Sequence, residues 1–192
     1  MKILCFGDSN TYGYDPRSYF GDRYPVQCRW VDLLAEKLNA EIINAGENGR
    51  EIPRREGELR RFDLLLTNQQ PIDLLVIMLG SNDLLQGNSV EAVSERMEHF
   101  LHHIHLERSK ILLIAPPPMQ RGEWVSSQTL IDASIALRDA YRTLSARLGV
   151  RFADAGKIPL TFDGVHFTEE GHKAFAEGFA KILQEKGDAH VF

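Results

Sequence analysis

The sequence predicts an α/β fold, in which a parallel sheet is covered by helices on both faces. Short apolar segments alternate with longer amphipathic ones along the 192 residues, a pattern typical of repeated strand–helix units. Three of the apolar segments contain almost no polar residue, as expected of strands that are buried on both faces. Right-handed crossovers between such strands produce one open sheet.

Five apolar segments are predicted to be strands. They are residues 3–6, 42–45, 74–79, 111–115 and, with a weaker pattern, 150–153. Glycines follow the first three, at Gly7, Gly46 and Gly80, and three prolines follow the fourth, at 116–118. Glycine and proline commonly end regular elements, so these positions mark the strand exits.

Helices are predicted where apolar residues recur every three to four positions. The segments are 30–38, 59–66, 89–106, 127–148 and 168–183. Ser89 and Thr168 stand where N-caps belong, and Gly149 is expected to end the fourth helix. No linker or repeat interrupts the chain, so residues 1–192 are predicted to form a single domain with a frayed tail after about residue 186.

The composition argues against several classes of partner. The net charge is −5, so the chain lacks the basic field that would attract nucleic acid or an anionic membrane. No segment approaches the ~20 apolar residues of a membrane span, and the apolar run at 3–6 is too short for a signal peptide. The two cysteines, Cys5 and Cys28, favour a reducing compartment. We therefore expect a cytoplasmic protein with a small-molecule partner.

Four polar segments lie where such a fold places its ligands. Gly-Asp-Ser-Asn at 7–10, Asn-Ala-Gly-Glu-Asn-Gly-Arg at 44–50 and Gly-Ser-Asn-Asp at 80–83 each follow a predicted strand, and Asp-Gly-Val-His at 163–166 precedes the last helix. Ligands of open parallel sheets bind beyond the carboxyl ends of the strands. The four segments are therefore expected to converge on one edge of the sheet.

The residues in these segments predict nucleophilic catalysis by a serine. A serine hydroxyl needs an adjacent base, and a carboxylate commonly orients that base. Ser9 is the candidate nucleophile, His166 the candidate base and Asp163 the residue that orients it. The Ser9 N–H, the Gly49 N–H and the Asn82 side-chain amide are candidate donors to an oxyanion.

The four segments, in this order, resemble the four blocks of the SGNH hydrolases, also called the GDSL family of esterases and lipases. Asn10 stands where leucine is common in that family. The resemblance extends from residue 3 to about residue 180. It is closer to bacterial arylesterases and acyltransferases, because of residues 3–9, the pair Arg29-Trp30 and residues 165–168.

The resemblance implies a flavodoxin-like three-layer α/β/α sandwich with five parallel strands in the order 2-1-3-4-5. It also implies a serine esterase of the arylesterase or carbohydrate acetylesterase type. Such an enzyme cleaves short-chain acyl esters through an acyl-enzyme, needs no cofactor or metal, and can pass the acyl group to an alcohol. Relatives assemble, so a homo-oligomer is expected. Asn10, Trp124 and Val165 are the candidate substrate contacts.

Several residues have a second interpretation. Gly46 competes with Gly49 as the oxyanion donor, although alignment of Asn44-Ala45 with the family block favours Gly49 and leaves Gly46 as a turn residue. Asp8 and Asp83 are expected to accept hydrogen bonds from loop N–H groups. Trp124 is either a wall of the pocket or an anchor for its loop.

Two other patterns suggest different sites. His99, His102, His103 and His105 include a one-turn pair that could bind a metal ion, but a solvated helix face explains them better. His172 is predicted to lie at the surface. The alternative for the whole chain is a flavin- or phosphate-binding module at residues 7–13, for which Thr11 and Gly13 are the supporting residues. A catalytically silent scaffold is the third hypothesis.

Overall fold

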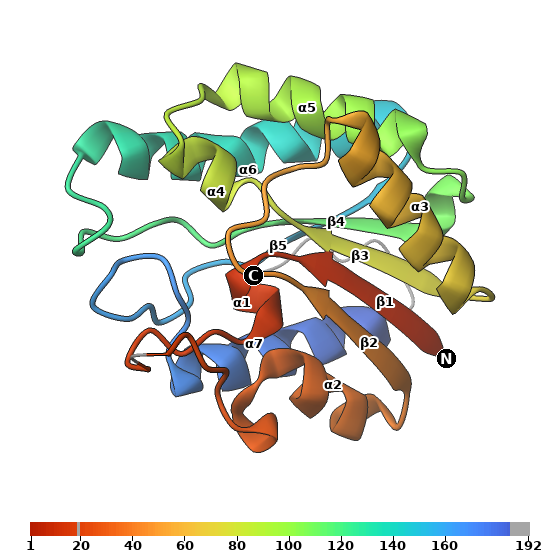
Figure 1. The fold of residues 1–192 in the computed structure, drawn as a ribbon, viewed down its shortest axis with the longest axis horizontal. Coiled ribbons are helices and arrows are strands. Elements are labelled where there is room, and N and C mark those ends of the chain that lie inside the picture. Colours follow the sequence, from red (N-terminus) through yellow and green to blue (C-terminus); the bar gives the residue numbers. More distant parts are fainter. Residues whose placement is uncertain (19, 185–192) are drawn as a thin grey trace.

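A computed structural model describes residues 1–18 and 20–184. Its centre is a five-stranded parallel sheet in the order β2-β1-β3-β4-β5 (Figure 1). The strands are β1 (Lys2–Gly7), β2 (Glu41–Gly46), β3 (Leu74–Met78), β4 (Ile111–Ala115) and β5 (Arg151–Asp154). The predicted parallel sheet and its strand order are confirmed. The tail expected to fray after about residue 186 lies outside the described residues.

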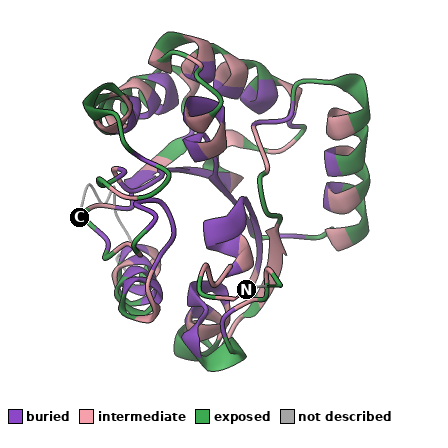
Figure 2. Ribbon diagram, turned by 60° about the vertical axis from the view of Figure 1, so that its left-hand side comes forward, coloured by how far each residue is buried: buried purple, intermediate pink, exposed green. Residues whose placement is uncertain are grey.

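Helices cover both faces of the sheet (Figures 1 and 2). Residues of α2 and α7 pack on one face, and residues of α3, α5 and α6 pack on the other. The α-helices are α1 (Ser9–Tyr12), α2 (Trp30–Leu38), α3 (Glu56–Gln69), α4 (Ser81–Leu85), α5 (Val90–His103), α6 (Gln128–Leu148) and α7 (Glu169–Gln184), and the short 3₁₀ turns are η1 (Val26–Cys28) and η2 (Arg108–Lys110). In the described residues, no helix has the length and apolar character to cross a membrane.

The alternation of side chains along β1 explains why this strand is apolar throughout. Ile3 and Cys5 join the core beneath α2 and α7, whereas Leu4 and Phe6 join the core on the opposite face. All four are almost fully buried. A strand between two helical layers buries both of its faces, so hydrophobic residues at every position are stabilising.

The structure refines the predicted helix boundaries. The helix predicted at 59–66 runs over Glu56–Gln69, and the Glu58 carboxylate accepts the N–H groups of Arg54 and Arg55 at 3.0 Å each. This contact satisfies two donors just before the helix and favours the earlier start. The N-caps at Ser89 and Thr168 are confirmed, since their hydroxyls accept the N–H groups of Ala92 and Gly171.

The surface position predicted for His172 is wrong. This side chain has 0% exposure and packs against Tyr24 and Phe167. It stands three and seven positions before Phe175 and Phe179, so it lies on the same inner face of α7. Burial lowers the pKa of His172 to about 3, and the ring is therefore neutral at physiological pH.

Helix α1 packs directly on the end of β2, and this contact requires Gly46. The turn role expected for Gly46 is wrong, because it is the last residue of β2. A Cβ atom at this position would lie 2.1 Å from the backbone nitrogen of Tyr12. The missing side chain therefore allows the helix that carries Ser9 to approach the strand.

We expect Gly46→Ala to lower the free energy of unfolding by about 2–3 kcal/mol, because the added methyl group overlaps backbone atoms of α1. Gly57→Ala is the matched control, since a Cβ there meets nothing within 4 Å. The control is expected to leave stability unchanged or to raise it by up to about 1 kcal/mol. Urea denaturation measures both, and equal stability of the two variants would contradict the packing role of Gly46.

Candidate active site

The three residues predicted to form a catalytic triad lie together at the carboxyl edge of the sheet. Ser9 begins α1, immediately after β1, and Asp163 and His166 come from the loop before α7. The Ser9 Oγ atom lies 2.9 Å from His166 Nε2, and His166 Nδ1 lies 2.7 Å from Asp163 Oδ2. The two contacts span very different separations in the sequence, 157 positions for Ser9–His166 and three for His166–Asp163. They form one continuous path from hydroxyl to imidazole to carboxylate.

The Asp163 carboxylate has a second set of contacts within its own loop. Its Oδ1 atom accepts the N–H groups of Val165 at 2.8 Å and His166 at 3.0 Å. Burial raises the pKa of Asp163, but the hydrogen bonds from the His166 ring and from these two N–H groups lower it more, to about 2. Asp163 is therefore ionised at neutral pH and able to stabilise a protonated imidazole.

Asn10 connects α1 to both sides of His166. Its Nδ2 atom donates to the Val165 carbonyl at 3.1 Å, and its Oδ1 atom accepts the Phe167 N–H at 2.9 Å. The Asn10 carbonyl in turn accepts the Trp30 indole N–H at 2.9 Å. Asn10 is only 3% exposed and Val165 only 6%. The Asn10 amide therefore positions the histidine loop, and the substrate contacts expected of Asn10 and Val165 stay predictions.

The three candidate oxyanion donors come from three successive strand exits. Asn82, in α4, donates from Nδ2 to the Arg50 carbonyl at 3.0 Å. This bond fixes the orientation of the amide and leaves its second N–H able to donate to an oxyanion. Gly49 has a φ of 73° and open space around its Cα. No hydrogen bond joins the N–H of Gly49 or of Ser9 to another residue in the part of the chain that the structure describes.

A buried aspartate, Asp83, joins the loop that contains Gly49 to the helix that contains Asn82. Asp83 has 0% exposure and accepts the Ile52 N–H at 3.0 Å and the Arg96 guanidinium at 2.9 Å. Burial raises the pKa of Asp83, while these two donors act to lower it. The contacts tie the start of α4 to the segment after Gly49, so Asp83 accepts a loop N–H group as expected from the sequence.

Comparison with known proteins agrees with this geometry. Residues 5–174 match the model of the GDSL-like lipase/acylhydrolase family. The chain belongs to this family. No curated protein sequence matches this hydrolase.

Solved structures resemble this GDSL-family hydrolase over nearly its whole length. A candidate arylesterase from Agrobacterium tumefaciens C58 is 30% identical, with a TM-score of 0.84 and coverage of 96% of this chain and 98% of the other. The aryl esterase of M. smegmatis is 25% identical (TM-score 0.82; 95% and 98% covered). A carbohydrate acetylesterase family member from Sinorhizobium meliloti is 26% identical (TM-score 0.81; 95% and 97% covered).

Two aromatic side chains border the imidazole of the hydrolase. The rings of Tyr14 and Trp124 meet His166 edge-on, with centroid distances of 4.8 and 5.0 Å. The backbone N–H of Trp124 donates to the Asp163 carbonyl at 3.1 Å, although the residue remains 52% exposed. This backbone contact joins the loop of Trp124 to the histidine loop, and the role of its side chain as a pocket wall stays a prediction. Tyr14 was not identified from the sequence, because nothing in its local pattern indicates a contact with residue 166.

The histidines near the end of α5 do not form a cluster that could hold a metal ion. His103 Nε2 lies 2.9 Å from Asp63 Oδ1 of α3, whereas His99, His102 and His105 are exposed. No group of three or more His, Cys, Asp or Glu side chains within residues 1–18 and 20–184 could hold a metal ion. His103 differs from the expected solvated face because α3 packs beside this part of α5.

Asp8, next to the candidate nucleophile, is a buried carboxyl group whose protonation affects the stability of the fold. Burial raises the pKa of Asp8 to about 6, whereas the Asn10 N–H, His166 and Arg50 act to lower it. Because the folded protein binds this proton more tightly than the unfolded chain, Asp8 favours folding at low pH. That contribution is lost as the pH rises from about 4 to about 6.

We expect Asp8→Asn to be more stable than the wild type at pH 8 by up to about 3 kcal/mol, because asparagine can still accept the Asn10 N–H and carries no charge. The difference should shrink toward pH 4. Urea denaturation at several pH values measures it, and Asp132→Asn on the exposed face of α6 controls for the loss of one charge. A difference that does not depend on pH would contradict the assignment.

Proposed function

We propose that this GDSL-family hydrolase is a serine esterase for short-chain acyl esters, of the arylesterase or carbohydrate acetylesterase type. The observation that carries this proposal is the hydrogen-bonded path from Ser9 through His166 to Asp163. A serine bonded to an imidazole that is itself bonded to an ionised carboxylate is the arrangement that activates a hydroxyl.

In the proposed reaction, Ser9 Oγ attacks the ester carbonyl carbon while His166 Nε2 takes the hydroxyl proton. The Ser9 N–H, the Gly49 N–H and the Asn82 amide stabilise the negative oxygen of the tetrahedral intermediate. The ester C–O bond then breaks, and His166 returns its proton to the departing alcohol. Asp163 orients the ring and stabilises its protonated form. The acyl group remains on Ser9.

Water completes the cycle by the same steps. His166 removes a proton from water, the resulting hydroxide attacks the acyl-enzyme, and the carboxylic acid leaves as Ser9 recovers its proton. An alcohol at the same position would give acyl transfer instead of hydrolysis. The aromatic edges of Tyr14 and Trp124 support this second outcome, because they place an apolar border beside the attacking position.

The flavin- or phosphate-binding alternative has less support. The Asp8 carboxylate accepts the Asn10 N–H at 3.0 Å, and so a negative charge already caps the first turn of α1. A phosphate at that turn would meet this buried carboxylate. The alternative also gives no role to the contacts of Ser9 with His166.

A cytoplasmic location and a homo-oligomer are further proposals for this hydrolase. Cys5 and Cys28 are both unpaired and buried, which supports a reducing compartment. Sedimentation of the purified protein would establish whether it assembles.

We expect Ser9→Ala to reduce kcat for 4-nitrophenyl acetate by at least about 10⁴-fold, because the nucleophile is removed and the other triad members cannot replace it. A fluorophosphonate probe should label the wild type and leave Ser9→Ala unlabelled. Ser127→Ala, at an exposed position before α6, is the matched control and should behave as the wild type. Full activity of Ser9→Ala with an unchanged fold would disprove the mechanism.

The short-chain preference predicts a steep dependence on acyl length. We expect kcat/KM for 4-nitrophenyl esters to fall by at least about tenfold between butyrate and octanoate, since a site for short acyl groups does not accommodate four further methylene groups. Initial rates across acetate, butyrate, hexanoate and octanoate measure this dependence. A higher kcat/KM for octanoate than for acetate would contradict the proposed substrate class.

A further inference from the structure

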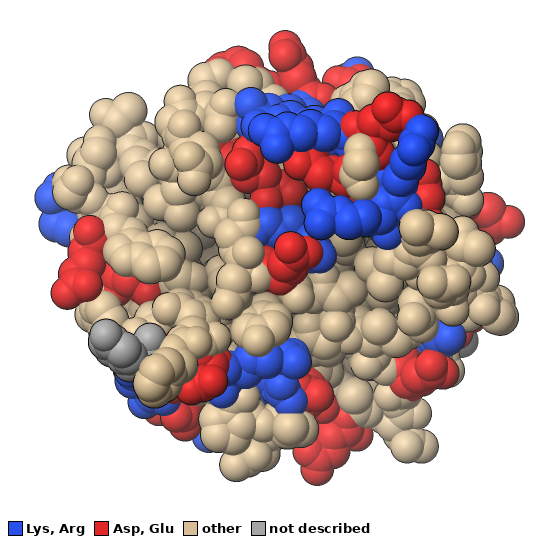
Figure 3. All heavy atoms as spheres, viewed as in Figure 1, with Lys and Arg blue, Asp and Glu red and all other residues tan. Residues whose placement is uncertain are grey.

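A cavity of about 250 Å³ lies between α3 and the loop that follows β2. Phe6, Phe62 and Leu65 provide its apolar lining, and Gly49 belongs both to this lining and to the candidate oxyanion donors. Acidic and basic side chains gather on this face of the molecule (Figure 3). The mechanism described above uses none of these charged side chains, so the cavity requires a separate explanation.

The carboxylates that line the cavity already have partners. Glu47 pairs with Arg50 at 2.6 Å, and Glu51 pairs with Arg54 at 3.1 Å. Glu58 accepts two backbone N–H groups just before α3. Their negative charge is therefore largely balanced by neighbours, and a cation has little reason to enter.

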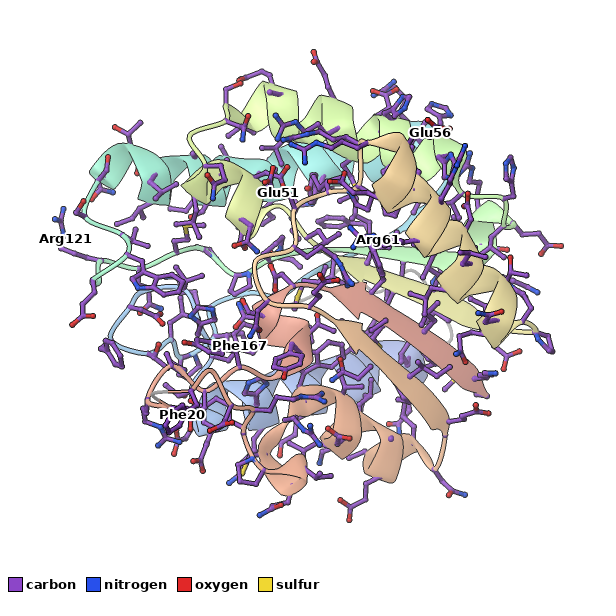
Figure 4. The ribbon with its side chains drawn as sticks, in the orientation of Figure 1. Phe20, Glu51, Glu56, Arg61, Arg121 and Phe167 are labelled. Atoms are coloured by element: carbon purple, nitrogen blue, oxygen red, sulfur yellow. The ribbon has the colours of Figure 1, made fainter. Side chains whose placement is uncertain are left out.

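Arg61 differs from these paired groups. Its side chain lines the cavity and is exposed to solvent at the edge of α3 (Figure 4). No ion pair or hydrogen bond links its side chain to another residue in the described ranges 1–18 and 20–184. Its neighbour Arg60, by contrast, pairs with Glu56. An anion in the cavity would therefore meet a guanidinium whose donors are all available.

Arg50 makes the second basic wall and is fixed in place. Its guanidinium lies 4.2 Å from the centre of the Phe6 ring, and it donates to the carbonyls of Gly7 and Ala45. Gly7 and Ser9 are separated in the sequence by Asp8 alone. The cavity is thus built on the same backbone that positions the nucleophile.

We propose that this cavity is a subsite for an anionic group of the ester substrate, a carboxylate on a short apolar or aromatic body, with Arg61 as its ion-pairing partner. This inference rests on the proposed esterase function and names the substrate class more closely. The body of the ester packs on the half-buried side chain of Leu65, because Phe6 and Phe62 are only 4% and 1% exposed. The carboxylate pairs with the Arg61 guanidinium, whose planar geometry suits two parallel hydrogen bonds. Because Gly49 borders both places, one ester can occupy the oxyanion donors and the subsite together.

Two matched pairs of esters test the subsite. 4-Acetoxybenzoate and 4-acetoxybenzamide differ by a charge on the alcohol part, and 4-nitrophenyl monosuccinate and 4-nitrophenyl butyrate differ by a charge on the acyl part. We expect Arg61→Ala to lower kcat/KM about tenfold for the anionic member of one pair, and less than about twofold for both neutral members. Arg60→Ala is the matched control on the adjacent position of α3 and should change neither.

A loss confined to an anionic ester supports the subsite and identifies the part of the ester that enters it. Equal effects of Arg61→Ala on anionic and neutral members of both pairs would overturn the proposal.

A binding measurement separates this proposal from the esterase function. Benzoate binding to Ser9→Ala, followed by ligand-observed NMR, should weaken about tenfold when Arg61→Ala is added. Unchanged benzoate binding overturns the subsite. If the wild type hydrolyses none of the neutral esters but benzoate still binds through Arg61, the proposed function fails and the anion site stands.

Discussion

The candidate site depends on the attachment of the histidine loop to the first turn after β1. Asn10 holds this loop by the Val165 carbonyl and the Phe167 N–H, one on each side of His166. The backbone of residue 166 can therefore move relative to Ser9 only if the contacts of this buried amide are broken. Buried hydrogen bonds of this kind are costly to leave unmade, so they define one geometry for the loop. The remaining contacts of the site build on that geometry.

Three buried aspartates at this edge of the sheet have different roles because their surroundings differ. Asp163 accepts hydrogen bonds from two backbone N–H groups and from the His166 ring, and these bonds lower its pKa to about 2. Asp8 has fewer donors, and burial raises its pKa to about 6. Asp83 is balanced by Arg96 and the Ile52 N–H. The same chemical group can thus orient a base, cap a helix or join two loops.

Much of this arrangement could be predicted from the sequence, because it follows from local patterns. The short apolar segments, three of them nearly free of polar residues, predicted the five strands, and the polar segments at their ends predicted which residues would converge. Helices α1 and α4 were missed since four or five residues do not display a helical period. The buried position of His172 was also missed, although its spacing from Phe175 and Phe179 contained the signal.

Other features depend on contacts between distant elements, and no local pattern contains them. The close approach of α1 to Gly46 involves residues more than thirty positions apart. The pairing of Asn10 with residues 165 and 167 spans nearly the entire chain. At the cavity beneath α3, Arg60 pairs with Glu56 whereas Arg61 lines the cavity. These contacts form when distant elements pack together, so they could be recognised only from the positions of the side chains in the structure.

The two tryptophans of the chain occupy opposite environments. Trp30 is fully buried beneath the sheet, whereas Trp124 is half-exposed with its ring edge-on to His166. Indole emission depends on local polarity, and a protonated imidazole in contact quenches it. The fluorescence of this hydrolase therefore contains two separate signals, one from the core and one from the imidazole at the site. Replacing Trp124 by phenylalanine would leave a probe of the core, and replacing Trp30 would leave a probe beside His166.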